Sequence, residues 1–234
     1  MNYMDNNIEN SFDKDNNKIL KDLINDGDEI EYSDVHDMRQ SLCIALVNYE
    51  LNSDMLTCVP HRRFLDLAII PIWKLGKGFS ERFVSVTNSI CDVWGVDHDD
   101  IINLAIKYSA DVSGFVFSEF SGFMNTICQD SFEPDNEDIY ILTNDVTRFG
   151  ASAICYDGIL KHIYYRLQRN YYVIPANIDN VFIIPESSKE VDVFGFAMGI
   201  AMINQRILGI KDFLSNKIYY YDHEKDKFDI VKLN

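Results

Sequence analysis

The chain has 234 residues, of which 47% are hydrophobic and 13% aromatic, a composition typical of a globular protein rather than a disordered or fibrous one. Its formal net charge is −16, and −7 of that total lies in residues 1–40, which hold eleven acidic and four basic side chains. Such an acidic surface repels the phosphate backbone of nucleic acids, so no direct nucleic-acid binding is predicted. The charge fits either solubility alone or the recognition of a basic partner.

The five cysteines are widely spaced and include no Cys-x-x-Cys pair, which predicts buried, reduced thiols rather than a disulfide framework. The histidines lack a second His or Cys at ligand spacing, so we predict no metal and no cofactor. The N-terminal residues show neither the basic nor the apolar part of a secretory signal. The most apolar run, Val193–Ile203, is too short to cross a bilayer, and a cytoplasmic protein is therefore predicted.

Taken in chain order, residues 1–32 predict a flexible acidic leader, and residues 33–234 a single α+β domain with a weaker boundary near 128–138. Apolar residues at helical spacing predict a helix from the caps Ser33 and Asp34 to about Tyr49. A shorter helix is predicted to follow and to end at Pro60.

The next segment predicts a hairpin followed by a helix. Phe64–Trp73 is rich in β-branched and aromatic residues and predicts a buried strand, whose far end Pro71 should weaken. A turn at Gly76–Gly78 leads into a returning strand at Arg82–Thr87. Asp97 and Asp99 are predicted caps of a helix through Tyr108. In the segment beyond it, four phenylalanines have helical spacing: Phe115, Phe117, Phe120 and Phe123.

The last hundred residues predict short strands and helices joined by turns, and the mixture favours an α+β fold with a mixed or mostly antiparallel sheet. Strands are predicted at Ile139–Thr143, Ala151–Cys155, Tyr171–Ile174, Val181–Ile184, Lys217–Tyr221 and Lys227–Val231. Helices are predicted at 157–168, with Asp157 as its cap, and at 191–207.

Several segments, in this order, resemble an uncharacterised bacterial family of domains of unknown function found in anaerobic gut bacteria. They are Val59-Pro-His-Arg-Arg-Phe-Leu-Asp-Leu67, then Tyr140-Ile-Leu-Thr-Asn144 with Gly150-Ala151, then Tyr172-Val-Ile-Pro175 with Val181–Pro185, and Ile218-Tyr-Tyr-Tyr-Asp222. The resemblance covers about residues 35–234. It implies a fold and a bacterial or phage setting, and it implies no activity.

The chain departs from that family at one place. Similar members carry Pro-Ser-Ser-Ile-His-Glu after the strand at 171–174, whereas this chain has Pro-Ala-Asn-Ile-Asp-Asn at 175–180. If the Ser/His/Glu cluster were catalytic in the family, this member should be inactive. The substitution more simply indicates a turn and a cap.

Two groups of polar residues are candidate ligand-binding residues, and no catalytic residue is predicted. His61, Arg62 and Asp66 could together bind a phosphate or carboxylate. The alternative, which we favour, is that Pro60 ends a helix, the arginine pairs with the acidic leader, and His61 caps or packs. Thr143 and Asn144 lie where a strand meets a turn, and their alternative role is turn hydrogen bonding.

Two further groups are candidate interface residues. Gly195 and Gly199 lie in an apolar helical pattern and permit close backbone approach, either within the chain or across a homodimer. Tyr219, Tyr220 and Tyr221 offer aromatic contact area. In a strand the first and third of these tyrosines share one face, so at least one face should belong to the core.

The leading functional hypothesis is a non-enzymatic cytoplasmic protein-binding module, whose partner is another protein or a second copy of the chain. A sharper alternative is an acidic, immunity-like or phage-encoded inhibitor of a basic, nucleic-acid-processing target. The competing hypothesis is a small-ligand site or enzyme around His61, Asp66 and Asn144, which requires these segments to meet around a cavity.

Overall fold

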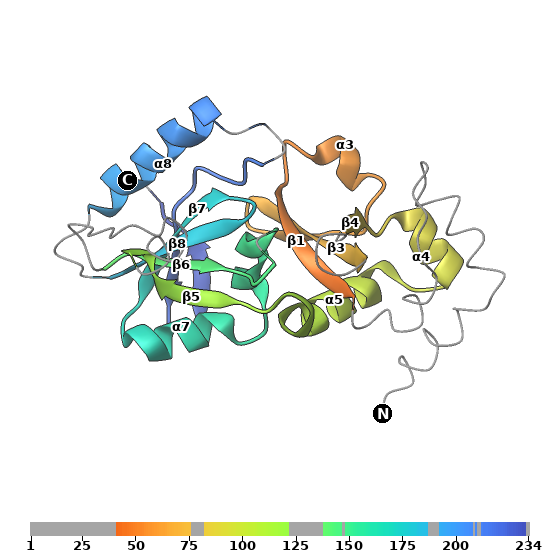
Figure 1. Ribbon diagram of the computed structural model, residues 1–234, viewed down its shortest axis with the longest axis horizontal. Coiled ribbons are helices and arrows are strands. Elements are labelled where there is room, and N and C mark those ends of the chain that lie inside the picture. Colours follow the sequence, from red (N-terminus) through yellow and green to blue (C-terminus); the bar gives the residue numbers. More distant parts are fainter. Residues whose placement is uncertain are drawn as a thin grey trace.

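The computed structural model (Figure 1) describes residues 41–75, 82–121, 138–146, 148–186, 192–207, 209 and 212–232. It contains helices and two antiparallel sheets, which confirms the predicted α+β class. The acidic leader and the turn at Gly76–Gly78 lie outside the described residues. The single-domain boundaries stay a prediction.

The first sheet has β3 at its centre, with β1 on one side and both β2 and β4 on the other. Its strands are β1 (Leu42–Asn48), β2 (Arg62–Phe64), β3 (Leu67–Leu75) and β4 (Arg82–Ser85). The helices beside it are α3 (Ser53–Leu56), α4 (Asn88–Trp94) and α5 (His98–Ser113). As predicted, Asp97 caps α5, and its side chain accepts the Asp99 N–H. α5 packs along β1 (Figure 1).

β1 occupies residues for which the sequence predicted the end of a helix, and that prediction is wrong for residues 42–48. The residues between the apolar positions of the predicted helix face, such as Cys43, Ile44 and Val47, are apolar too. All seven residues of the strand are buried. A run without a polar face suits a strand covered on both sides better than a surface helix. At the outer edge of β1, Ile44 N donates to Ser109 Oγ of α5 at 3.0 Å.

The strand predicted at Phe64–Trp73 is interrupted by a turn. Leu65 has a φ of 58° and turns the chain between β2 and β3. Pro71 lies inside β3, between the residues that pair with β2 and those that pair with β4, so neither ladder needs the missing N–H. Its carbonyl accepts the Val86 N–H at 3.0 Å. The returning strand at 82–85 is confirmed.

The second sheet has six antiparallel strands in the order β10-β9-β7-β8-β6-β5. They are β5 (Val116–Glu119), β6 (Tyr140–Thr143), β7 (Tyr171–Asn177), β8 (Asn180–Pro185), β9 (Tyr219–Asp222) and β10 (Lys227–Ile230). The strands predicted at 139–143, 171–174, 181–184 and in the last hairpin are confirmed. Residues 116–119 form a strand despite the helical spacing of the phenylalanines, of which Phe123 lies outside the described residues.

The strand predicted at Ala151–Cys155 is wrong, because residues 150–155 form a 3-10 helix, η3 (Gly150–Cys155). Its sequence GASAIC consists mainly of small residues, so the tight helix fits against both β1 and β6. β6 pairs instead with β5 and β8.

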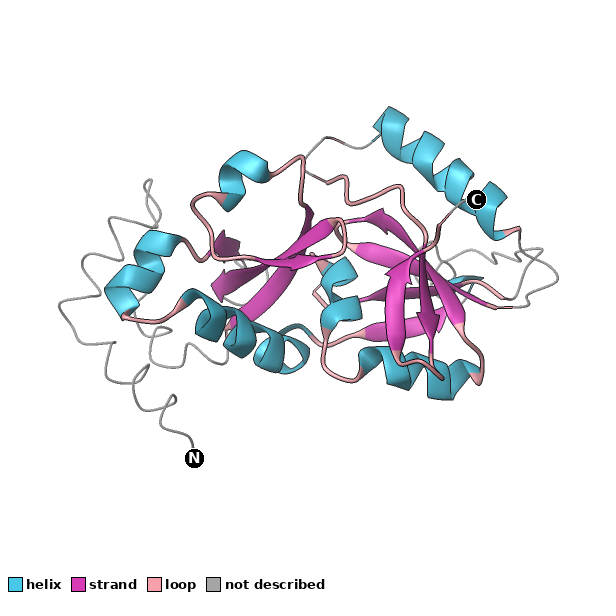
Figure 2. Ribbon diagram, turned by 180° about the vertical axis from the view of Figure 1, so that it is seen from behind, coloured by secondary structure: helices cyan, strands magenta, loops and turns pink. Residues whose placement is uncertain are grey.

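The two long helices of the C-terminal half are confirmed as α7 (Ile159–Leu167) and α8 (Val193–Ile207). The prediction that Asp157 caps α7 is wrong. Gly158 takes the N-cap position with a φ of 76°, and no side chain caps the helix. The two helices lie on opposite faces of the second sheet (Figures 1 and 2). On β7, Tyr171 and Val173 belong to the core shared with α7, whereas Ile174 belongs to the cluster under α8.

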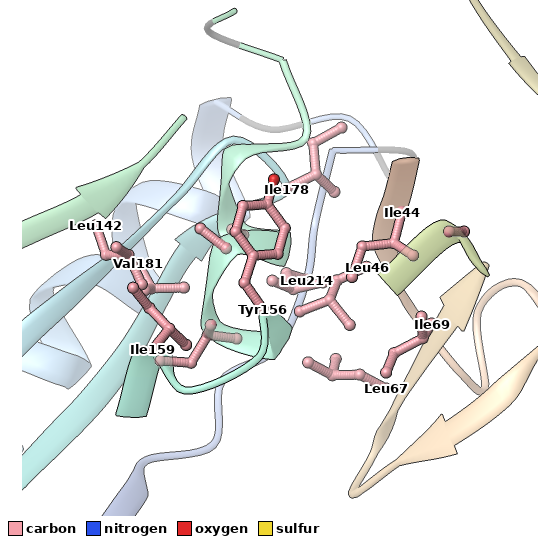
Figure 3. Close-up of a cluster of buried hydrophobic side chains, with 14 of the residues drawn as sticks. Ile44, Leu46, Leu67, Ile69, Leu142, Tyr156, Ile159, Ile178, Val181 and Leu214 are labelled. Carbon is pink, nitrogen blue, oxygen red and sulfur yellow. The ribbon is translucent and has the colours of Figure 1, made fainter. Parts of the chain in front are cut away.

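The largest cluster of buried side chains spans both sheets (Figure 3). Ile44, Leu46 and Leu67 of the first sheet belong to it together with Leu142 and Val181 of the second. Tyr156, directly after η3, stands between the two groups. This shared core fixes the relative position of the motifs in the two halves of the chain.

Candidate functional site

Asp66 joins the first sheet to the end of the chain. Its Oδ1 accepts the Tyr219 hydroxyl and its Oδ2 accepts the Ser215 hydroxyl, each at 2.7 Å. Nearby, Asn48 Nδ2 donates to the Leu214 carbonyl at 2.9 Å. Both carboxylate oxygens of Asp66 are therefore engaged within the protein.

Thr143 and Asn144 link the end of β6 to neighbouring loops through side-chain hydrogen bonds. Thr143 Oγ1 donates to the Asp179 carbonyl at 2.8 Å, and Asn144 Nδ2 donates to the Arg148 carbonyl at 2.8 Å. The Asp179 carboxylate accepts the Phe149 N–H at 2.8 Å. Within the described residues, no hydrogen bond joins this group to Asp66.

Asn144 belongs to a cluster of buried polar side chains that lies where η3 meets β1. Ser113, Asn144, Ser152 and Tyr156 are each at most 5% exposed. Burial raises the pKa of Tyr156 to about 12, against the opposing effect of the surrounding Ser152, Ser113 and Asn144 side chains. Burial likewise raises the pKa of the Cys43 thiol to about 11, so it is protonated at neutral pH and a poor nucleophile.

The predicted tyrosine interface is largely internal. Tyr219 and Tyr221 are 2% and 1% exposed and face the core, while Tyr220 on the other face is half-buried against Tyr172. Asn170 Nδ2 donates to the Tyr220 hydroxyl at 3.1 Å. The expected alternation of the three tyrosines is confirmed.

His61 lines a surface pocket of about 630 Å³ between α3 and the first turn of α5. The other polar residues that line it are Thr57, Asn88, Asp92, Asp97, His98 and Asp99. Arg62 lies beside the pocket and donates to Asn103 Oδ1 at 3.0 Å and to Asp99 Oδ1 at 3.4 Å. Asp66, Thr143 and Asn144 do not line the pocket. Its carboxylates suit a cationic or hydrogen-bonding ligand better than a phosphate.

No metal site is found among the described residues, since no three His, Cys, Asp or Glu side chains are grouped to hold an ion. Nor does that part of the chain contain a helix with the length and apolar character needed to span a membrane. Of the four cysteines described there, all are free; Cys43 and Cys91 are buried, whereas Cys58 is exposed.

The outer face of α8 is apolar and open. Phe194, Met198, Met202 and Ile203 are 45%, 67%, 53% and 51% exposed. Only three other large hydrophobic side chains in the described residues are exposed, and none of them lies on α8: Leu51, Phe115 and Tyr165. We call the surface formed by Phe194, Gly195, Met198, Gly199, Met202 and Ile203 the α8 face.

The inner side of the same helix is apolar as well. Phe196 meets Phe182 of β8 edge to face at 5.1 Å, and Ala197 and Ile200 pack on the same cluster. Because both sides of the helix are apolar, sequence periodicity singled out Gly195 and Gly199 but not the exposed side chains around them.

A family of unknown function (DUF5688) matches residues 3–223. The chain belongs to DUF5688. None of the curated proteins and none of the solved structures matches it.

The segments that carried the family resemblance contact one another in this DUF5688 protein. Asp66 of the first segment accepts the Tyr219 hydroxyl of the last, and Ile141 and Leu142 of the second pair with Phe182 and Val181 of the third. In the run at 175–180, where similar members carry Ser, His and Glu, Asn177 Oδ1 accepts the N–H groups of Asp179 and Asn180. These polar residues close turns and join segments.

Proposed function

We propose that this DUF5688 protein is a non-enzymatic, cytoplasmic protein-binding module and that the α8 face is its binding surface. The observation that carries the proposal is the concentration of exposed apolar side chains on one helix, in a chain whose net charge is −16. Contiguous exposed apolar patches mark interaction sites in soluble proteins. Aromatic and methionine side chains are also enriched where partners bind.

The polar candidates have internal partners, which supports a structural role for the motifs, whereas the α8 face has no partner among the described residues. Asp66, Thr143 and Asn144 are engaged by internal hydrogen bonds.

The proposal is tested by replacing Met198, which is 67% exposed, with Asp. Met198→Asp should keep the thermal stability of the parent chain, because the side chain has little packing to lose. In cells carrying the wild-type chain, cross-linking should capture a discrete complex that Met198→Asp loses. Leu51→Asp, at a residue that is 51% exposed and lies outside α8, is the matched control and should retain the complex. If both variants capture the complex equally well, the α8 face is rejected as the binding surface.

A small-ligand site is the second candidate function, and the pocket beside His61 favours it. Its acidic lining would take a cationic ligand, such as an amine or a guanidinium group. A thermal-shift screen of such compounds tests it. The expected result is a stabilisation that Asp92→Asn and Asp99→Asn both reduce, and stabilisation unaffected by these changes would place the ligand elsewhere.

A further inference from the structure

We infer that the occupant of the α8 face is α8 of a second copy of this chain, running antiparallel about a two-fold axis at Gly199. The inference rests on the proposed function, because it names the partner of the same surface. It follows from the spacing of the exposed residues, the open space at the glycine and the placement of the charges.

Five residues on the outer side of α8, beginning with Asp192 just before the helix, follow the spacing of a helix–helix seam. Asp192, Gly195, Gly199, Met202 and Arg206 are separated by three, four, three and four residues and so lie on one face. Four of the five are exposed and Gly199 is partly exposed. A surface with this period is suited to a second helix.

The centre of this seam is open to close approach. A β-carbon at Gly199 would meet no heavy atom within 4 Å, and one at Gly195 would meet only the Asp192 side chain. A helix can therefore approach the backbone here more closely than the usual 8–10 Å or so between helix axes. The flanking Met198 and Met202 side chains can adapt their shape to the partner.

The charges at the two ends of the seam favour an antiparallel second copy. Asp192 lies seven residues before Gly199 and Arg206 seven residues after it. A two-fold axis at Gly199 thus brings Asp192 of each copy level with Arg206 of the other, about 10 Å from the axis. A parallel pair would instead bring like charges together. Within the described residues, neither side chain forms an ion pair of its own.

The rest of the surface also directs two copies to this helix. Each chain carries a net charge of −16, so most pairings of surfaces bring acidic residues together. Between Val193 and Ile207 the only charged residue is Arg206. The α8 face is therefore the surface where apolar burial is large and mutual repulsion small.

A pair of helices about 22 Å long makes a small interface, so we expect a dissociation constant in the micromolar range. Sedimentation of the purified full chain should show a concentration-dependent rise from 27.1 kDa to twice that mass. Met198→Asp should raise the dissociation constant about a hundredfold, since both copies lose apolar burial and gain a buried charge. Leu51→Asp should leave it unchanged.

A charge exchange tests the antiparallel register. Asp192→Arg and Arg206→Asp, each alone, should weaken association about tenfold, because each replaces two attractions by two repulsions. The double variant Asp192→Arg/Arg206→Asp should restore wild-type affinity. Single variants without effect, or a double variant as weak as either single one, would overturn the register.

A disulfide test locates the axis directly. In a chain with Cys58→Ser and Cys128→Ser, we would mix an Asp192→Cys variant with an Arg206→Cys variant under mild oxidation. The expected product is a disulfide between the two different variants, and neither variant alone should form one. A disulfide between two copies of the Asp192→Cys variant would indicate a parallel pair and overturn the inference.

The two proposals fail in different ways. A purified chain that stays monomeric through the micromolar range, while Met198→Asp still loses its complex in cells, rejects the second copy and keeps the α8 face as a surface for a different protein. A dimer that survives Met198→Asp rejects this mode of association. A monomeric chain whose complex in cells also survives Met198→Asp rejects both proposals.

Discussion

One carboxylate, that of Asp66, connects two sheets that are distant in sequence. Its partners Ser215 and Tyr219 lie 149 and 153 residues further along the chain. Burial and the neighbouring Asp66 charge raise the pKa of the Tyr219 hydroxyl, so it stays a hydrogen-bond donor at neutral pH. The residue that looked most like a ligand-binding group therefore has an evident structural task.

Removing this carboxylate should destabilise the fold. Asp66→Ala leaves the buried Tyr219 hydroxyl without its acceptor, and we expect a loss of about 2–3 kcal/mol in the free energy of unfolding in urea. Tyr219→Phe alone should cost about 1–2 kcal/mol, and the double variant should show a coupling of about 1 kcal/mol or more. The exposed Asp111→Ala is the control and should change little. Strictly additive losses would contradict the link.

Buried tyrosines should make the protein sensitive to alkaline pH. The pKa of Tyr156 is about 12 when folded, against its ordinary value of 10.0, because of burial. Between these values the unfolded chain releases a proton that the native chain keeps, so stability falls by about 1.4 kcal/mol per pH unit for each such group. When the pH is below the ordinary tyrosine pKa of about 10, this loss of stability is absent.

The measurement is urea unfolding at about pH 8 and about pH 11, each monitored by far-UV circular dichroism. Tyr171 and Tyr219, whose pKa values are also raised by burial, add to the expected loss. Tyr156→Phe should reduce the difference in stability between the two pH values. Equal stability of the wild type at both would contradict the prediction.

At the scale of elements, η3 is held by close backbone contacts at its first residue. A β-carbon on Gly150 would overlap the Asp179 carbonyl oxygen and the Thr143 hydroxyl, and would lie 2.7 Å from the Asn144 nitrogen. Ala151 N also donates to the Ile178 carbonyl at 3.1 Å. The 3-10 helix thus needs glycine where it meets the ends of β6 and the β7–β8 turn.

Gly150→Ala should therefore destabilise the protein by about 2–4 kcal/mol, because backbone atoms, which cannot rotate away, occupy the space. Gly199→Ala is the matched control, since a β-carbon there meets no heavy atom within 4 Å. In a dilute, monomeric sample it should stabilise the helix by up to about 1 kcal/mol. Urea unfolding of both variants checks the contrast, and similar effects would argue against the contacts at Gly150.

At the scale of the whole molecule, the net charge of −16 separates the two kinds of partner. A basic partner is attracted by this charge, and salt weakens that attraction. A second copy is repelled by it, and salt relieves the repulsion while leaving apolar burial intact.

Raising the salt concentration from about 0.05 M to about 0.5 M should therefore strengthen self-association, because the Debye length becomes shorter than the spacing of most surface charges. Sedimentation at both concentrations measures it. The acidic-inhibitor alternative makes the opposite prediction for its complex with a basic target. A dimer that dissociates as salt rises would show that ion pairs, rather than the apolar α8 face, hold it together.

Local patterns determined much of this protein. The α+β class, the β7–β8 and β9–β10 hairpins and the two long C-terminal helices were predictable, because turn residues and hydrophobic periodicity act over a few neighbouring residues. The same reasoning placed Tyr219 and Tyr221 on one face of a strand.

Only the tertiary structure decided the rest. Residues 42–48 are a strand because α5 and η3 pack against it and bury all seven residues, and an apolar run carries no local sign of such cover. Residues 150–155 form a 3-10 helix whose first residue must be glycine, because atoms of Thr143, Asn144 and Asp179 occupy the space of a β-carbon. Likewise, α8 is apolar all round, so its open face is set by the side on which β7 and β8 lie. Such contacts join residues far apart in the chain, and local periodicity does not encode them.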